Sequence, residues 1–169
     1  IPNLETMLTS KEFTRSDAII MASFLGYSVY VGRVMAGYLL DIVWAPALAC
    51  VLQMMPAISM YIFTLPDPTY AQMVTGIVVL GVAAGVEYDL LAYLVARYFG
   101  MRSYARIYGT LYAFFGLGAG FGPAIFGSIY GQTGSYDLAM QYSMWGFIIC
   151  SLSFLLLGRY RDEQLKAMV

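Results

Sequence analysis

The chain has 169 residues, of which 60% are hydrophobic and only 11% are charged. Soluble domains have about 45–50% apolar and about 25% charged residues, so this chain has too few polar side chains to cover a surface in water. The same shortage of charge excludes a disordered chain, a coiled coil and a nucleic-acid-binding protein. The composition therefore predicts a polytopic membrane protein that lies in the lipid bilayer.

Five apolar runs follow one another, each long enough to cross a bilayer as a helix, which takes about 20 residues. They cover residues 18–40, 43–65, 70–96, 107–130 and 138–158. None alternates with the period of two that barrel strands show, so we expect an all-α bundle of five transmembrane helices. Only Asp41 and Ile42 separate the first two runs, and such short links predict antiparallel neighbours.

The basic residues outside the runs lie mostly on one side of the expected membrane. Lys and Arg are enriched in cytoplasmic loops, and six of them fall in the third connection and the tail, against two before the first run. The six are Arg97, Arg102, Arg106, Arg159, Arg161 and Lys166, and the two are Lys11 and Arg15. We therefore expect the N-terminus of this sequence outside and its C-terminus in the cytoplasm, in a plasma (inner) membrane.

Glycine recurs at four-residue spacing, at Gly81 and Gly85 in the third run and at Gly118 and Gly122 in the fourth. Small residues at this spacing let helices approach closely in lipid, so close packing is expected for both runs. An alternative interpretation concerns Gly122 and Pro123. Because proline breaks an i→i−4 hydrogen bond, the two residues would bend a helix that moves during function.

Residue types that carry catalysis or hold metals are scarce. The chain has no histidine, and its two cysteines, Cys50 and Cys150, lie far apart inside apolar runs. No nucleophile elbow, phosphate loop or metal-ligand spacing is present in the sequence. We therefore expect no enzyme activity, no cofactor and no metal site.

Three charged residues lie inside the apolar runs: Arg33, Glu87 and Asp89. An ionisable group in a spanning helix costs about 2.5–3.5 kcal/mol on insertion scales and marks a functional site. At about 1.5 Å per residue, all three lie about 12–15 Å from the expected cytoplasmic ends of their runs. Asp89 and Glu87 point about 200° apart, so they are not a carboxylate pair, and the third run should be the most enclosed. We predict Asp89 as the partner of Arg33, with Glu87 as the next candidate.

Arg33 is interpreted as a clamp for a substrate carboxylate, which a guanidinium binds with two parallel hydrogen bonds. Two alternatives remain open for Arg33. It forms a structural ion pair with either acid, or its side chain reaches the inner membrane interface. Glu87 and Asp89 are proton carriers in one interpretation and structural charge partners in the other. Tyr30 shares an expected inward face with Arg33. Tyr112 offers a hydroxyl to an anion or only packs.

Several stretches resemble motifs of the major facilitator superfamily. Gly37 to Asp41 resembles the G-x-x-x-D core of its cytoplasmic loop motif, and residues 118–123 resemble its G-x-x-x-G-P helix motif. Arg97 begins a stretch similar to the junction of the tenth and eleventh helices. The resemblance covers all 169 residues and implies helices eight to twelve of a twelve-helix transporter, without the N-terminal half and helix seven. It also implies a gating and packing role for Gly37, Asp41, Arg97, Gly118, Gly122 and Pro123, including a latch between Asp41 and the arginines of the third connection.

With Arg33 in the run that resembles helix eight, the chain resembles the monocarboxylate and oxalate–formate porters. The helix-eleven lysine of oxalate transporters, however, has no counterpart in residues 107–130. We therefore predict a secondary active transporter of a small organic anion that works by alternating access, with a coupled proton as a further partner. A proton-coupled exporter of neutral or cationic drugs, and a non-transporting scaffold or receptor, remain open. An open cavity beside Arg33 favours transport, and a closed, dry Arg33–Asp89 bridge favours the scaffold.

Overall fold

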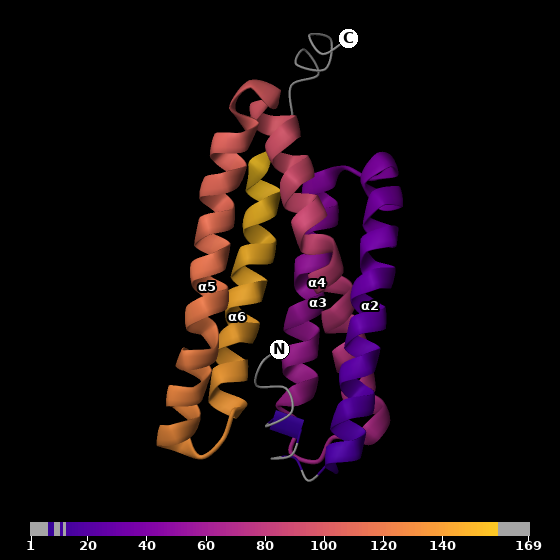
Figure 1. Ribbon diagram of the computed structural model, residues 1–169, viewed down its shortest axis with the longest axis vertical. Coiled ribbons are helices and arrows are strands. Elements are labelled where there is room, and N and C mark those ends of the chain that lie inside the picture. Colours follow the sequence, from indigo (N-terminus) through magenta and orange to yellow (C-terminus); the bar gives the residue numbers. More distant parts are fainter. Residues whose placement is uncertain (1–6, 9–10, 12, 159–169) are drawn as a thin grey trace.

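A computed structural model describes Met7, Leu8, Lys11 and residues 13–158 of the chain. Five long helices lie side by side along the long axis of the molecule (Figure 1). They are α2 (Arg15–Ile42), α3 (Ala45–Phe63), α4 (Tyr70–Phe99), α5 (Tyr104–Thr133) and α6 (Asp137–Phe154), with short 3-10 helices η1 (Met101–Ser103) and η2 (Leu155–Leu157). All five are long and apolar enough to span a membrane, which confirms the all-α polytopic fold.

Local capping signals set the helix ends, and they lie outside the apolar runs. Thr14 and Thr69 begin α2 and α4, each in a capping box with the residue three positions on, which satisfies orphan backbone donors. Gly134 ends α5 with a φ of 72°, a left-handed conformation that glycine adopts without strain. Asp41 and Ile42 were expected to form the first link, but they complete the last turn of α2, and the link is Val43–Trp44.

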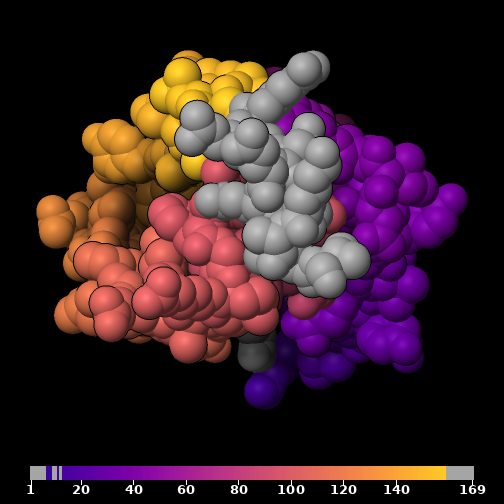
Figure 2. Space-filling view, turned by 90° about the horizontal axis from the view of Figure 1, so that it is seen from above, coloured from indigo at the N-terminus to yellow at the C-terminus, as the bar shows by residue number. Residues whose placement is uncertain are grey.

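The helices pack unequally. α2 packs most extensively on α4, and α3 packs on both α6 and α4. α5 touches α4 and α6 only slightly, and none of its residues is buried. Figure 2 shows α5 and α6 (salmon through orange to yellow) on one side of the molecule, and α2 with the start of α3 (purple) on the other. The described chain is therefore a packed unit of α2, α3, α4 and α6 with α5 at its edge.

The crossing of α2 and α4 depends on small residues. A Cβ added to Gly81 would lie 2.7 Å from the Ser28 Cβ, and one added to Gly85 would overlap the Val29 carbonyl. A Cβ added to Gly32 would overlap the Val82 carbonyl in the same way. These contacts confirm close packing for the glycines of the third run, because only a hydrogen on the Cα fits there.

The same expectation is wrong for α5 within the described residues. A Cβ added to Gly118 or Gly122 would meet no atom within 4 Å apart from its own helix. The physical reason is the position of α5, since no described helix covers the side that carries these two glycines. Pro123 lies inside α5, which stays one helix from Tyr104 to Thr133, and its role as a bend stays a prediction.

The third run is also not the most enclosed of the five. The most apolar stretch of α3 is 44% buried and that of α4 is 39% buried. α3 lies between α4 and α6, whereas one side of α4 is left partly open, where Tyr88 lines a cavity and Asp89 is 45% exposed. Two acidic residues on one spanning helix therefore did not make that helix the most buried one among the described residues.

Candidate functional site

Arg33 and Asp89 meet where α2 crosses α4. The Arg33 Nε lies 3.6 Å from the Asp89 Oδ2. Gly85, one turn before Asp89 on the same face of α4, lies against the α2 backbone, where an added Cβ would be 3.1 Å from the Arg33 amide nitrogen. The close approach at this glycine brings the guanidinium beside the carboxylate. The predicted pairing of Arg33 with Asp89 rather than Glu87 is therefore confirmed.

The pair is open rather than enclosed. The Arg33 and Asp89 side chains are 58% and 45% exposed within the described chain. An ion pair with this exposure contributes about 0–1 kcal/mol, because solvent screens it and two long side chains must be ordered. The dry bridge that would favour a scaffold is not formed among the described residues, and the guanidinium remains accessible to another anion.

Glu87 and Tyr88 complete the charged segment of α4. Glu87 is half-buried and lies about 200° around the helix from Asp89, so the two carboxyl groups do not share a site. Tyr88 lies between them in the chain and points toward α5, where its ring lies 5.1 Å from Phe115 in an edge-on contact and 5.9 Å from Tyr112. The sequence analysis did not single out Tyr88. The available signal was its position, about 100° from each acid.

An aromatic row runs along α5 at helical spacing. Tyr104 and Tyr108 stack at 5.5 Å, Tyr108 and Tyr112 at 5.9 Å, and Tyr112 and Phe115 at 6.1 Å. Tyr108, Tyr112 and Phe115 therefore share one face of α5. Because Tyr88 contacts two members of the row, the row links α5 to the part of α4 that carries Asp89. A role for the Tyr112 hydroxyl in anion binding stays a prediction.

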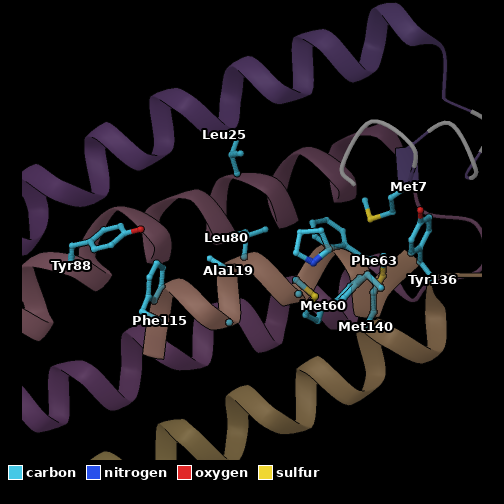
Figure 3. A pocket seen from close by; sticks show the side chains of 14 residues that line it. Met7, Leu25, Met60, Phe63, Leu80, Tyr88, Phe115, Ala119, Tyr136 and Met140 are labelled. Carbon is cyan, nitrogen blue, oxygen red and sulfur yellow. The ribbon is translucent and has the colours of Figure 1, made fainter. Parts of the chain in front are cut away.

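An apolar cavity of about 420 Å³ lies between α5 and the other helices. Tyr88 and Phe115 are at one end, and Met7 and Tyr136 are at the other (Figure 3). The remaining lining residues are almost all apolar and come from every long helix, among them Leu25, Met60, Leu80, Ala119, Phe126 and Met140. Gly118, Gly122 and Pro123 also line it. The cavity suits hydrocarbon groups, and the charged pair lies beyond its Tyr88 end.

The predicted inward face of α2 is not buried within this chain. Tyr30 is 73% exposed, and a Cβ added to Gly26 or Gly37 would meet nothing within 4 Å. The buried face is a neighbouring one, formed by Ala18, Met21, Leu25, Ser28, Gly32, Ala36 and Leu40. Small residues on that face let α2 lie directly on the α4 backbone. Arg33 stands at the edge of this contact, and Tyr30 does not line the cavity.

The residues predicted to form a cytoplasmic latch lie at one end of the bundle. Asp41 is exposed in the last turn of α2. The Arg97 guanidinium lies 5.0 Å from the centre of the Tyr93 ring, a cation–π contact that holds it along α4. Arg102 and Arg106 are exposed, and Arg159, Arg161 and Lys166 lie outside the described residues. A latch between Asp41 and the arginines stays a prediction.

Comparison with known proteins adds the family. A family model described as Major Facilitator Superfamily matches residues 1–167. The chain is 28% identical over 156 residues to "Monocarboxylate transporter 9" of Rattus norvegicus, which covers 91% of this chain and 30% of that protein. Proteins of the same name from Pongo abelii and Mus musculus are 28% identical over 138 residues, or 81% of this chain and 26% and 27% of their own lengths. The chain thus spans less than a third of these relatives. No solved structure matches.

Proposed function

The chain belongs to the Major Facilitator Superfamily, and from that premise we propose that it forms part of a carrier for a small monocarboxylate-like anion. Family membership makes it part of an integral membrane transporter of small molecules rather than an enzyme. We propose further that its five helices are helices eight to twelve of the complete transporter, that the N-terminal half and helix seven lie upstream, and that transport proceeds by alternating access. The substrate class is supported by relatives named monocarboxylate transporter 9.

The observation that carries the proposal is the open Arg33–Asp89 pair. A guanidinium stays charged and offers two parallel N–H donors to a carboxylate. Its contact with Asp89 runs through Nε at 3.6 Å, so the pair is weak enough to exchange partners. In the empty carrier Asp89 neutralises Arg33, and in the loaded carrier the substrate carboxylate takes its place.

This exchange also couples a proton to the anion. When the substrate carboxylate binds Arg33, two negative charges would face one positive charge unless a proton enters the site with the anion, and Asp89 is the first candidate to carry it. One anion and one proton then move together, and the site keeps its net charge. Glu87, which is half-buried on another face of α4, is the second candidate for the proton. Tyr30 and Tyr112 are further candidates for contact with the substrate.

The orientation proposed here follows the positive-inside rule. Arg97, Arg102 and Arg106 and the C-terminus lie in the cytoplasm, and the start of α2 lies outside, in the plasma (inner) membrane. A latch between Asp41 and these arginines would then close on the cytoplasmic side in one state of the carrier and open in the other.

The test is uptake of a radiolabelled monocarboxylate by the complete transporter in proteoliposomes, with Arg33→Lys as the variant. Lysine keeps the charge but lacks the planar fork. We expect kcat/KM to fall about 10- to 100-fold, because a hydrogen bond to a charged group contributes about 1.5–3 kcal/mol. Arg15→Lys, the same substitution at an exposed position at the start of α2, is the control and should transport normally. Full activity of Arg33→Lys would leave Arg33 only a structural role.

The same assay separates the two alternative functions. Drug transport by a proton-coupled exporter of neutral or cationic drugs would be unchanged in Arg33→Lys and lost in Glu87→Gln or Asp89→Asn. A scaffold or receptor would show no uptake of any solute in the unsubstituted protein.

A further inference from the structure

We infer that the anion carried is an aryl-substituted monocarboxylate, whose ring lies against aromatic side chains of α4 and α5 while its carboxylate binds Arg33. These side chains are Tyr88, Tyr112 and Phe115, named here the α4–α5 aromatic cluster. The inference rests on the proposed function, because it needs a carboxylate at Arg33. It adds the chemical class of the group to which that carboxylate is attached.

The first observation is the position of the aromatic cluster beside the charged pair. Tyr88 directly precedes Asp89, so their Cα atoms are about 3.8 Å apart. The Asp89 Oδ2 lies 3.6 Å from the Arg33 Nε. A substrate carboxylate that takes the place of Asp89 is therefore bound one residue away from the ring that joins α4 to α5. A ring joined to the carboxylate by a short carbon chain reaches both.

Small side chains lie between the charged pair and the aromatic cluster. At about 100° per residue, the arc of α4 between Tyr88 and Asp89 contains Gly85, Ala92 and Ala96. None of these residues has a side chain larger than a methyl group, and Ala92 and Ala96 are only half-buried. Gly85 lets α2 approach, whereas the two alanines leave the next two turns of this face low. A flat ring fits on that face better than a second bulky protein side chain would.

The second observation is that helix packing does not explain the aromatic row on α5. Tyr104, Tyr108 and Tyr112 stack along one helix, so their contacts with one another join no two helices. Tyr112 is still 47% exposed although its ring lies near that of Tyr88. Acyl chains offer no hydrogen-bond partner to a phenol, and tyrosine in spanning helices is enriched near the headgroups. Tyrosines at the depth of the charged pair therefore suit the path of a solute rather than a lipid-facing surface.

The third observation is the geometry of the rings. Aromatic pairs prefer edge-on or offset-stacked contacts with centroids about 4.5–7 Å apart. Tyr88 meets Phe115 edge-on at 5.1 Å, and Tyr112 and Phe115 stack at 6.1 Å. A substrate ring on the exposed side of Tyr112 continues this arrangement. Tyr88 and Phe115 also form one end of the apolar cavity (Figure 3), so an apolar substituent on the ring would have apolar neighbours.

The test is calorimetric binding of three acids to the purified complete transporter: propionate, 3-phenylpropionate and 3-cyclohexylpropionate. We expect the Kd for 3-phenylpropionate to be at least about 10-fold below that for propionate, because the ring adds apolar burial and aromatic contacts. It should also be below the Kd for 3-cyclohexylpropionate, whose ring has a similar size and no π-system. Uptake of the three acids into proteoliposomes, corrected for entry into protein-free vesicles, is measured alongside.

Substitutions on α5 identify the residue that contacts the substrate ring. Tyr112→Leu removes the aromatic ring and should raise the Kd for 3-phenylpropionate about 2- to 12-fold, with the Kd for propionate unchanged. Phe114→Leu is the matched control and should change neither Kd, because Phe114 lies about 200° around α5 from Tyr112 and is 68% exposed. Tyr112→Phe keeps the ring and should bind both acids normally. Phe115→Leu serves if Tyr112→Leu fails to accumulate.

Other results would overturn the inference. Equal Kd values for propionate and 3-phenylpropionate, with uptake of both, would remove the aromatic class and leave the proposed function intact. A Kd for 3-cyclohexylpropionate as low as that for 3-phenylpropionate would mean that the site selects apolar rather than aromatic groups. Weaker binding of both acids by Tyr112→Phe would assign the Tyr112 hydroxyl to the carboxylate instead. Absence of uptake of every acid would contradict the proposed function itself.

Discussion

The α2–α4 crossing and the side of α5 that faces the cavity both carry glycines at four-residue spacing, yet only the first is packed. At the crossing, Gly81 and Gly85 lie directly against the backbone of α2. On α5, Gly118 and Gly122 face open space. The same sequence pattern therefore marks a completed contact in one place and an uncompleted one in the other. Small-residue spacing reports that a helix can approach closely, and it does not report which helix approaches.

If α5 is a spanning helix with an uncompleted contact, it must cross the membrane although no described residue buries it. With Cys50 and Cys150 replaced, Ser103→Cys and Gln132→Cys place thiols at opposite ends of α5. In sealed cells, we expect an impermeant maleimide to label position 132 and not position 103, because the basic residues near 103 are cytoplasmic. Labelling of both from outside would show that α5 does not span. Labelling of 103 alone would reverse the proposed orientation.

Alanine substitutions should distinguish the packed glycines of α4 from the open glycines of α5. Gly85→Ala should destabilise the purified complete transporter by about 1–3 kcal/mol, because the added Cβ overlaps the Val29 carbonyl and overpacking costs this much. Gly116→Ala, at an open position of α5 outside the cavity lining, should leave the melting temperature unchanged or raise it, since alanine favours helix by about 1 kcal/mol over glycine. Equal losses for both variants would mean that the glycines act through the backbone alone.

The two regions also differ in how far the sequence predicts them. The pairing of Arg33 with Asp89 followed from depth and helical face, because both residues are rare charges in apolar runs. The buried face of α2 did not follow. Gly32 and Ala36 lie on the packed side and Gly26 and Gly37 on the open side, and in lipid both sides are apolar. Hydrophobic periodicity therefore cannot tell which side is packed.

The helix ends and the cavity show two further limits. The apolar runs marked the parts of the helices that suit lipid, but α2 begins at Arg15 and α5 extends from Tyr104 to Thr133, because capping and backbone hydrogen bonds continue a helix into polar sequence. The cavity depends on the tertiary arrangement of five helices. From the sequence, residues 107–130 could be predicted as one spanning run, but which of its residues line a cavity could not be predicted.

A double-mutant cycle measures the polar contact at the packed crossing. Asp89→Asn, Arg33→Gln and the double variant should give a coupling free energy of unfolding below about 1 kcal/mol, because both side chains are about half exposed. A coupling of about 3–5 kcal/mol is expected of a buried pair and would mean that the upstream half of the transporter encloses these residues. Chemical unfolding or thermal melting of the purified variants is the measurement.

The same variants separate stability from transport. If Asp89 carries the coupled proton, an inward proton gradient should drive uptake by the unsubstituted carrier in proteoliposomes. Asp89→Asn should uncouple uptake from the gradient, whereas Glu87→Gln should keep the coupling. Loss of coupling in Glu87→Gln together with normal coupling in Asp89→Asn would move the proton to Glu87.

An effect of similar size is expected where the two regions join. Tyr88 is the residue of α4 whose ring contacts Tyr112 and Phe115 of α5, so it connects the packed crossing to the poorly packed helix. Tyr88→Ala should lose about 0.5–1.5 kcal/mol of ring contact, and Tyr88→Phe should keep the contact and the stability. Thermal melting of the purified complete transporter is the measurement. Equal losses for Tyr88→Ala and Tyr88→Phe would mean that the Tyr88 hydroxyl, rather than its ring, joins α4 to α5.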